Sequence, residues 1–357
     1  MEVSRRDFLK KCSLLGTSFF LLPASAPALQ KKPKNQDKTK AEEAKAWIPA
    51  YEKLEKAGDL GKRVEMAYSI FERCELCPRR CGVNRKKGER GFCQAPYRAM
   101  VYSAHPHYGE EESLVGRGGS GTIFFSNCNL RCVFCQNWQI SFEGQGQEVS
   151  DEQVAEMMLK LQKIGCHNIN LVTPTHVMPN ILQATQIACR QGLRLPLVYN
   201  TSGYERMEIL KILDGIVDIY MPDLKYMDGD LAAKYSSGAQ DYPEVTQQAI
   251  IEMHRQVGEL LIDRRGVALR GLIIRHLVMP NRVAGSKKFV KWVAEKLPKS
   301  TYVNIMAQYH PEYKAFEYPE IARHITGEEF LEAMEAAKKY GLKNLDPQSL
   351  RNRDRLF

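Results

Sequence analysis

Residues 128–138 read CNLRCVFCQNW and place Cys128, Cys132 and Cys135 at the spacing CxxxCxxC. A structural zinc site is closed by four protein ligands, whereas three thiolates leave one position of a metal centre open. The stretch follows an apolar run, GTIFFSN at 121–127, which has the length and composition of a buried strand. The sequence therefore predicts an open metal centre at the end of a strand.

Further apolar runs alternate with amphipathic helical patterns along the chain. The six runs occupy 121–127, 168–174, 195–201, 217–224, 269–280 and 302–309, and the helical patterns occupy 151–164, 178–191, 204–214, 243–262 and 285–297. Strands that are apolar on both faces and alternate with helices form a parallel sheet covered by helices. An α/β fold follows, either as an open doubly wound sheet or as a partial barrel.

The polar residues at the strand ends favour the barrel. Such residues in or after the six runs include Cys128, Thr173, Asn200, Asp223, Arg275 and Gln308. In barrel enzymes the chemistry gathers at the C-terminal ends of the strands. No GxGxxG or GxxxxGK(S/T) follows any run, so the phosphate-binding loop of the dinucleotide and P-loop folds is missing. We therefore predict a partial (β/α)6 TIM-like barrel with an N-terminal Cys-rich extension.

A second group of cysteines precedes the barrel. Cys74, Cys77, Cys81 and Cys93 have the spacing CxxCx3Cx11C and provide four thiolates, enough to close a metal site. Zinc and a second iron-sulfur cluster both fit, and we favour a metal over disulfides. The nearby sequence SAHPHYG offers His105 and His107 as further ligands or as solvent-facing residues.

The N-terminus has the pattern of an export signal. Arg5 and Arg6 precede an apolar run at 13–22 and small residues at 24–28 that fit a cleavage site. The run is short for a bilayer of roughly 30 Å. The combination resembles a twin-arginine signal, which implies the twin-arginine export machinery as a partner and a periplasmic, exported or membrane-tethered protein. If the signal is not used, the protein stays in the cytoplasm.

The charge of the chain argues against a nucleic-acid partner. The net charge is +9, but most of the excess falls in residues 1–63 and the remainder is close to balance. A nucleic-acid surface needs a basic patch, so we predict no such partner.

The cysteine loop and the strand ends together resemble a known family. CxxxCxxC after the first strand, with Phe134 just before the third cysteine, resembles the radical S-adenosylmethionine (SAM) superfamily. The segments CELCPRRCGVNRKKGERGFC, NLVTPTH, YNTSGYE, DIYMPDLKY and RHLVMPN resemble its pyruvate formate-lyase activating enzyme-like branch. The resemblance implies a 4Fe-4S cluster on Cys128, Cys132 and Cys135 whose open iron binds SAM. One electron then cleaves SAM to a 5′-deoxyadenosyl radical that abstracts hydrogen.

The resemblance also transfers cofactor contacts by position. Thr173 and Thr175 stand where the family has a turn that binds the amino group of SAM, although the acidic residue of that turn is missing here. Lys225 and Arg275 suit the carboxylate or the ribose. The remaining cofactor-binding residues implied by the resemblance are Phe134, Asn200, Ser202 and Asp223, with His310 facing the adenine. Each polar residue also has a structural alternative, such as an ion pair between Asp223 and Lys225.

The predicted organisation has five parts. Residues 1–28 form the signal, 29–63 a charged linker and short helix, 64–105 the Cys-rich metal-binding module, 106–315 the radical SAM barrel, and 316–357 a C-terminal helix and tail.

The implied partners are a low-potential electron donor and either a glycyl-radical protein or a small-molecule substrate. Two other functions remain open. One is an exported iron-sulfur electron carrier without SAM chemistry, and the other is a zinc scaffold in which the three cysteines borrow a fourth ligand.

Overall fold

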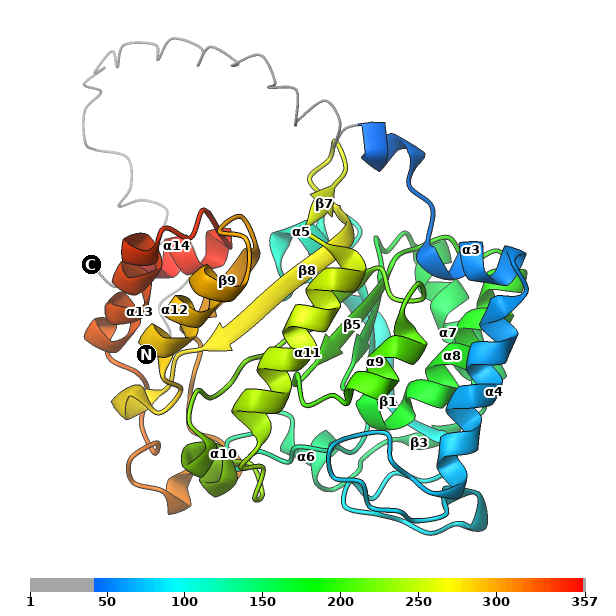
Figure 1. The fold of residues 1–357 in the computed structure, drawn as a ribbon, viewed down its shortest axis with the longest axis horizontal. Coiled ribbons are helices and arrows are strands. Elements are labelled where there is room, and N and C mark those ends of the chain that lie inside the picture. The colour runs from blue at the N-terminus through cyan, green and yellow to red at the C-terminus, as the bar shows by residue number, and fades with distance from the viewer. Residues whose placement is uncertain (1–41, 356–357) are drawn as a thin grey trace, which may run out of the picture. The chain divides into compact units, whose positions relative to one another are not determined.

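One ten-stranded sheet runs through residues 42–355, the part of the chain that the computed structural model describes (Figure 1). The predicted signal at 1–28 lies outside these residues. The strands are β1 Ala99–His107, β2 Ser120–Phe125, β3 Gln147–Val149, β4 Ile169–Val172, β5 Leu197–Thr201, β6 Ile219–Pro222, β7 Leu261–Ile262, β8 Ala268–Leu277, β9 Tyr302–Met306 and β10 Asn344–Leu345. They lie in the order β10-β9-β8-β6-β5-β4-β2-β1-β3, and β7 pairs with β8.

The parallel part of the sheet follows the sequence order without reversal. All six predicted strands are present as β2, β4, β5, β6, β8 and β9, and neighbouring pairs among them are parallel. A doubly wound sheet reverses its strand order at a switch point, whereas a (β/α) barrel does not. The α/β class with a mostly parallel sheet is confirmed. Its antiparallel edge, β1 with β3, was not predicted from the sequence.

Helices cover the outer face of this sheet (Figure 1). They are α7 Asp151–Ile164, α8 Met178–Arg190, α9 Met207–Leu213, α11 Tyr242–Val257, α12 Ser286–Lys296 and α13 Gly327–Tyr340. Helix α7 begins where predicted because Ser150 and Gln153 form a capping box, each side chain bonding the other's backbone N–H. Helix α11 ends before Gly258, whose φ of 71° does not continue a helix.

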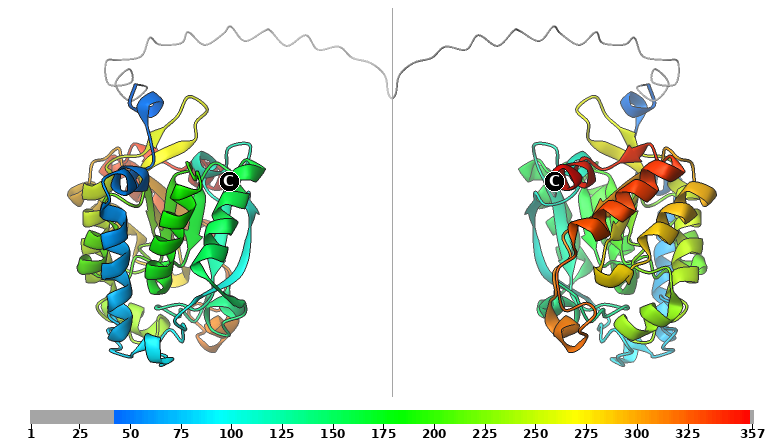
Figure 2. Two further views of the ribbon diagram at one scale, coloured as in Figure 1. Left: turned by 90° about the vertical axis from the view of Figure 1, so that its right-hand side faces the viewer. Right: turned by 90° about the vertical axis from the view of Figure 1, so that its left-hand side faces the viewer.

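The N-terminal helices belong to the same packed unit as the sheet. Helix α3 spans Ala50–Lys56 and α4 spans Asp59–Ser69, so the predicted boundary between residues 63 and 64 falls inside α4. Leu60, Val64 and Ala67 are buried on one side of α4, which packs against α8. The buried face of α4 was not recognised in the sequence because charged residues stand between its apolar residues. Seen edge-on, α4 (blue) and β1 (cyan) lie on opposite sides of the unit (Figure 2).

The two faces of the sheet bury different residues. Along β5, Leu197 and Tyr199 join the core beneath the helices, while Val198 points to the inner face, as the two-residue period of a strand requires. A short helix, α5 Glu112–Val115, supplies Leu114 to this inner face. Leu114 packs there in a small apolar cluster with Val198, Ile219, Met221, Ala268, Ile273 and Tyr302. The inner face is therefore filled at the level of this cluster.

An ion pair ties the segment before α5 to the far strands of the sheet. Arg275 of β8 donates to both carboxylate oxygens of Glu111, at 2.7 and 2.6 Å, and also pairs with Glu110. Asn304 of β9 donates to Glu111 at 2.9 Å. The chain between β1 and β2 thus reaches across the inner face to β8 and β9.

No helix among residues 42–355 is both long enough and apolar enough to span a membrane.

Candidate active site

A cavity of about 440 Å³ lies at the C-terminal ends of the parallel strands. The loop bearing residues 74–93 (cyan), α6 Trp138–Ser141 and α10 Gly229–Tyr235 gather at the end to which the arrowheads of β5 and β8 point (Figure 1). The residues that line the cavity include Cys128, Cys132, Cys135, Phe124, Val172, Asp223, Arg275, Leu277 and Met306. Its volume is within the range of small-molecule sites.

The cysteine loop owes its shape to two residues with left-handed backbone. Asn127 has φ 74° and Arg131 has φ 52°, so the chain turns sharply on either side of Cys128. Backbone bonds then fix the loop: Val133 donates to the carbonyl of Tyr235 and accepts from the N–H of Lys314, both at 2.9 Å. The three thiols consequently face one cavity, as the sequence predicts.

Hydrogen-bond donors surround the three sulfurs. Ser236 Oγ lies 3.1 Å from Cys132 Sγ, Ser141 Oγ lies 3.2 Å from Cys135 Sγ, and the N–H of Leu130 lies 3.4 Å from Cys128 Sγ. Burial raises the pKa of Cys132 to about 12, although the nearby ammonium of Lys225 acts in the opposite direction. Without a metal this thiol keeps its proton. As a metal-bound thiolate, its negative charge would be stabilised by the hydroxyl of Ser236 and the ammonium of Lys225.

The donor set fits an iron-sulfur cluster. Three cysteine thiols line one cavity, and a 4Fe-4S cluster takes each thiolate on a different iron. The cavity also contains Ser202, whose buried hydroxyl has no hydrogen-bond partner among the described residues. These features fit a cluster with a polar ligand beside it.

Seven of the nine predicted cofactor-binding residues line this cavity. They are Phe134, Thr173, Asn200, Ser202, Asp223, Lys225 and Arg275. Lys225 Nζ donates to Asp223 Oδ2 at 2.5 Å. Burial opposes the charge of Lys225, but the Asp223 carboxylate beside it raises the pKa of the ammonium well above its ordinary value. Asp223 and Lys225 therefore form the ion pair that the sequence offered as the alternative to cofactor binding, and this pair lies in the wall of the cavity.

Arg275 faces the cavity with its charge already matched. Its guanidinium is held by Glu110 and Glu111, which the sequence did not identify as its partners. The adjacent His276 points to the outer side, where it bonds the carbonyl of Leu224 at 2.7 Å and stacks on the ring of Phe289. Neighbouring residues on one strand thus serve opposite faces.

Thr175 and His310 do not line the cavity. Thr175 is buried and donates to the carboxylate of Glu205 at 2.6 Å. His310 is half-buried, and its Nδ1 lies 3.5 Å from a carboxylate oxygen of Glu312. Their predicted cofactor contacts are not supported by these positions, because the hydroxyl and the imidazole each face a carboxylate of the protein itself.

Other functional positions escaped the sequence prediction. His107 lines the cavity, with Nδ1 3.7 Å from a carboxylate oxygen of Glu110. The sequence offered His107 as a further metal ligand near the upstream cysteines, and the structure places it in the wall of the cavity that Cys128, Cys132 and Cys135 also line. Ser236 and Ser141 gave no signal, because a serine that bonds a sulfur resembles any other serine in a sequence.

The upstream cysteines form a separate group. Burial raises the pKa of Cys77, and the thiols of Cys93, Cys74 and Cys81 raise it further. The N–H of Phe92, the residue before Cys93, lies 3.3 Å from Cys81 Sγ. All nine cysteines within the described residues carry free thiols.

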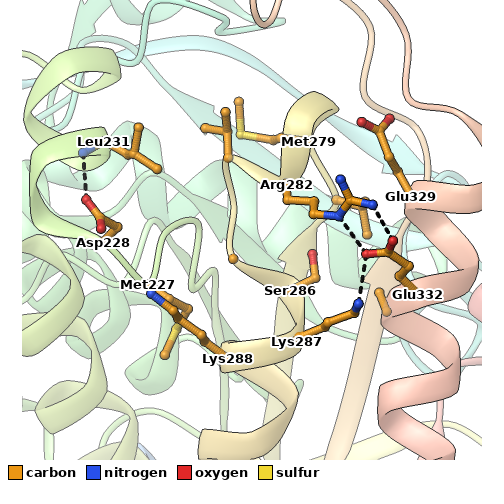
Figure 3. Close-up of a pocket in the computed structure, with 14 residues that line it drawn as sticks. Met227, Asp228, Leu231, Met279, Arg282, Ser286, Lys287, Lys288, Glu329 and Glu332 are labelled. Atoms are coloured by element: carbon orange, nitrogen blue, oxygen red, sulfur yellow. Dashed lines mark hydrogen bonds and ion pairs between the residues drawn. The ribbon is translucent and has the colours of Figure 1, made fainter.

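A second cavity of about 230 Å³ lies between α10, α12 and α13 (Figure 3). Its polar residues are already engaged, since Arg282 and Lys287 both pair with Glu332, and Asp228 accepts from the N–H of Leu231. It contains no cysteine. Chemistry that needs the three thiols therefore belongs to the first cavity.

Comparison with known proteins assigns the family. Residues 122–277 match the model of the Radical SAM superfamily. The chain is 36% identical over 293 residues to the uncharacterised protein MJ0674 of Methanocaldococcus jannaschii, a match that covers 79% of each protein. The chain belongs to the radical SAM superfamily. As a radical SAM protein it is an enzyme by family, and the family implies a 4Fe-4S cluster and SAM as cofactors.

Other similar proteins add no activity. The uncharacterised protein MJ0808 of the same organism is 25% identical over 288 residues, covering 72% of this chain and 79% of that protein. Methylornithine synthase aligns with a TM-score of 0.42 and 12% identity, covering 89% of this chain and 83% of that one. SuiB of Streptococcus suis, solved with its precursor peptide, aligns at 0.42 and 14%, covering 60% and 44%. At these TM-scores neither structure informs on the chemistry of this radical SAM protein.

Proposed function

We propose that this protein is a radical SAM enzyme in which Cys128, Cys132 and Cys135 hold a 4Fe-4S cluster beside bound SAM, within an open, partial (β/α)6 barrel. The observation that supports this is the convergence of three thiols and seven predicted cofactor-binding residues on one cavity, inside the segment that matches the superfamily. When bound, the cluster supplies the electron that splits SAM into methionine and a 5′-deoxyadenosyl radical, which abstracts hydrogen from the substrate.

The polar residues of the cavity bind and orient SAM in this proposal. Lys225 is the cation for the carboxylate of SAM, since it lines the cavity and its pair with Asp223 fixes its position. Asp223 and Asn200 accept from the amino group, and Ser202 supplies a hydroxyl that is still without a partner.

Apolar side chains exclude water from the same space. Phe134 is buried, and its ring centre lies 5.8 Å from that of Tyr309 and 6.3 Å from that of Tyr226. Leu277 and Met306 line the cavity from β8 and β9. A reactive carbon radical needs such a shielded site, because solvent and stray reductants would otherwise consume it.

The substrate we propose is a glycyl residue of a partner protein, as in the activating-enzyme branch, with a small molecule as the second candidate. The support is the resemblance of YNTSGYE and DIYMPDLKY to that branch. A low-potential donor must supply the electron. Deuterium transfer from a labelled substrate into 5′-deoxyadenosine tests each candidate. A deuterated glycyl peptide or protein that transfers no deuterium is excluded as the substrate.

Anaerobic turnover tests the SAM chemistry. Protein reconstituted with iron and sulfide should form 5′-deoxyadenosine when dithionite and SAM are added. Cys132→Ala should lose this activity by at least about a hundredfold, because only two of the three cluster ligands remain. Cys189→Ala, which removes a buried thiol on α8 far along the chain from the loop, serves as the control and should retain it.

The rival functions give different results in the same assay. An electron carrier would be reduced and reoxidised without forming 5′-deoxyadenosine. A zinc scaffold would be colourless and would contain no iron. Either result would contradict the proposed function.

We further propose export through the twin-arginine route, on the basis of Arg5, Arg6 and the apolar run that follows them. In a bacterial host that has this route, the full-length chain should fractionate with the periplasm or the membrane. Arg5→Lys combined with Arg6→Lys should keep it in the cytoplasm. Identical fractionation of the two proteins would refute the signal.

A further inference from the structure

The four upstream cysteines sit on one folded loop, residues 74–93. Its first half is closed by backbone bonds from Cys74 N to Val83 O at 2.8 Å and from Gly82 N to Cys74 O at 2.9 Å. The N–H of Phe92 points at Cys81 Sγ at 3.3 Å. These bonds bring Cys74 close to the segment after Cys81, and Cys81 close to Cys93.

Arg85 in this loop is a buried cation that has no carboxylate partner among residues 42–355. Only 1% of it is exposed. Its guanidinium donates to the carbonyls of Pro96, at 3.1 Å from Nε, and His176, at 2.6 Å from Nη1, and lies 4.2 Å from the ring centre of Phe71. None of these groups carries a negative charge. An isolated buried cation is costly, so a compensating charge should lie nearby.

The cysteines are the groups that surround this cation. Cys74 N donates to the carbonyl of Val83, two residues before Arg85, and Pro96, whose carbonyl accepts from Arg85, follows Cys93 by three residues. Neutral thiols would leave the charge of Arg85 unmatched. Four thiolates on a metal centre carry a net negative charge and would match it.

A zinc ion and a 4Fe-4S cluster both accept four thiolates, and metal analysis distinguishes the two centres.

We propose that Cys74, Cys77, Cys81 and Cys93 bind a second, fully ligated 4Fe-4S cluster, and that Arg85 is its buried counter-charge. All four irons then have a protein ligand, so this cluster has no open position for SAM. The proposal concerns a site separate from the SAM cavity and does not depend on the proposed function.

The second cluster would also support the first. Arg131, the residue before Cys132, donates to the carbonyl of Phe92, the residue before Cys93, at 3.2 Å. Arg79 lies over the ring of Phe92, 4.0 Å from its centre, and donates to the carbonyl of Asn129 at 3.1 Å. The loop that holds one cluster therefore contacts the loop that holds the other.

Iron, sulfide and zinc counts on anaerobically reconstituted full-length protein test the site. The wild type should contain about eight irons and about eight sulfides per chain, and Cys132→Ala should keep about four of each. Cys74→Ser combined with Cys77→Ser should also keep about four. Tightly bound zinc that the double variant loses, or a wild type with about four irons that Cys132→Ala removes entirely, would overturn the assignment.

The role of Arg85 needs a readout other than metal content. In the Cys132→Ala background, only the upstream cluster remains, and its midpoint potential can be followed by electron paramagnetic resonance. Arg85→Met should make this potential more negative, because reduction then adds charge without a neighbouring cation. Arg85→Lys should restore part of the shift. Arg90→Met removes an exposed cation from the same loop and should leave the potential unchanged.

An unchanged potential in Arg85→Met would refute the counter-charge. If Arg85→Met does not fold, the comparison of Arg85→Lys with Arg90→Lys replaces it, and equal potentials in that pair would refute it as well. Eight irons without SAM cleavage would contradict the proposed function and leave this inference intact.

Discussion

Glu205 is a buried carboxyl that contacts Thr201, a residue of the cavity wall. It is 1% exposed, and it accepts from the hydroxyls of Thr175 and Thr201. Burial raises its pKa to about 7, against the partly opposing effect of these hydrogen bonds. Asp218, at the start of β6, is similarly buried, and burial raises its pKa to about 7 as well. Two carboxyls of the folded protein therefore stay protonated in weakly acidic solution.

These carboxyls make stability depend on pH. In the unfolded chain Glu205 ionises near 4.5, so between that pH and about 7 the folded protein holds a proton that the unfolded chain has released. The contribution of Glu205 to the free energy of unfolding is therefore fully present below pH 4.5 and is lost as the pH rises towards 7. Above that pH the free energy of unfolding is lower by on the order of 3 kcal/mol because of this one group.

Glu205→Gln tests this dependence. The variant should match the wild type at pH 5 and should be more stable than it at pH 8, by about 1–3 kcal/mol, because the amide cannot ionise. Denaturant unfolding at both pH values, at equal metal content, measures the difference. Parallel curves for the two proteins would contradict the assignment. The remaining slope of the variant should come partly from Asp218.

At the scale of single residues, spacing predicted the ligands but not their partners. Cys128, Cys132 and Cys135 could be found because their spacing is local and specific. The pairing of Arg275 with Glu111 joins residues 164 positions apart, and nothing in either local sequence distinguishes it from a contact with SAM. For the same reason Thr175 was assigned to the cofactor and not to Glu205.

At the scale of elements, Arg79 holds the loop of the upstream cysteines, residues 74–93, against the cysteine loop at 128–135. Its guanidinium donates to the carbonyls of Asn129, Ser236 and Ser237 at 3.1, 3.0 and 2.8 Å. The hydroxyl of Ser236 also bonds Cys132 Sγ. Arg79 therefore contacts both the cysteine loop, at Asn129, and the serine that bonds its second cysteine.

Replacing Arg79 should loosen the cysteine loop. Arg79→Met leaves three carbonyls without their charged donor and should lower the free energy of unfolding by about 1–3 kcal/mol. Amides of residues 128–133 should exchange with solvent faster, as measured by hydrogen exchange. Arg80→Met changes the exposed neighbour and should behave like the wild type. Unaltered exchange in Arg79→Met would show that the loop is fixed by other contacts.

Whole elements were predicted best where their pattern was continuous. The six parallel strands and α7 were located from apolar runs and amphipathic periods that belong to single segments. Strands β1 and β3 were missed because β1 is interrupted by polar residues and pairs only at the edge of the sheet. Helix α4 was divided between the predicted linker with its short helix, 29–63, and the Cys-rich module, because several of its residues are charged and only its packing on α8 identifies the buried side.

At the scale of the whole molecule, side chains join the connection between β1 and β2 to the last strands of the parallel sheet, β8 and β9. Glu111 lies between Arg275 and Asn304, and Leu114 fills the inner face behind it. The sequence predicted the winding of the strands, since helices alternate with them. It did not predict how the inner face is filled, because that depends on a loop whose residues contact strands far along the chain.

Breaking this ion pair should destabilise the fold. Glu111→Gln leaves the buried guanidinium of Arg275 with Glu110 alone and should cost about 3 kcal/mol of unfolding free energy. Denaturant unfolding gives the value. Glu112→Gln removes the adjacent carboxylate, whose pair with Arg351 is exposed, and should cost less than about 1 kcal/mol. Equal losses of unfolding free energy in the two variants would mean that the ion pair between Glu111 and Arg275 stabilises the fold no more than an exposed ion pair does.

The junction made by Arg275 differs in kind from a seam of strand pairing. Backbone pairing between strands does not depend on which side chains the strands carry, whereas this link exists only while Arg275, Glu110 and Glu111 keep their charges. A single substitution can therefore remove it without changing the pairing of any strand.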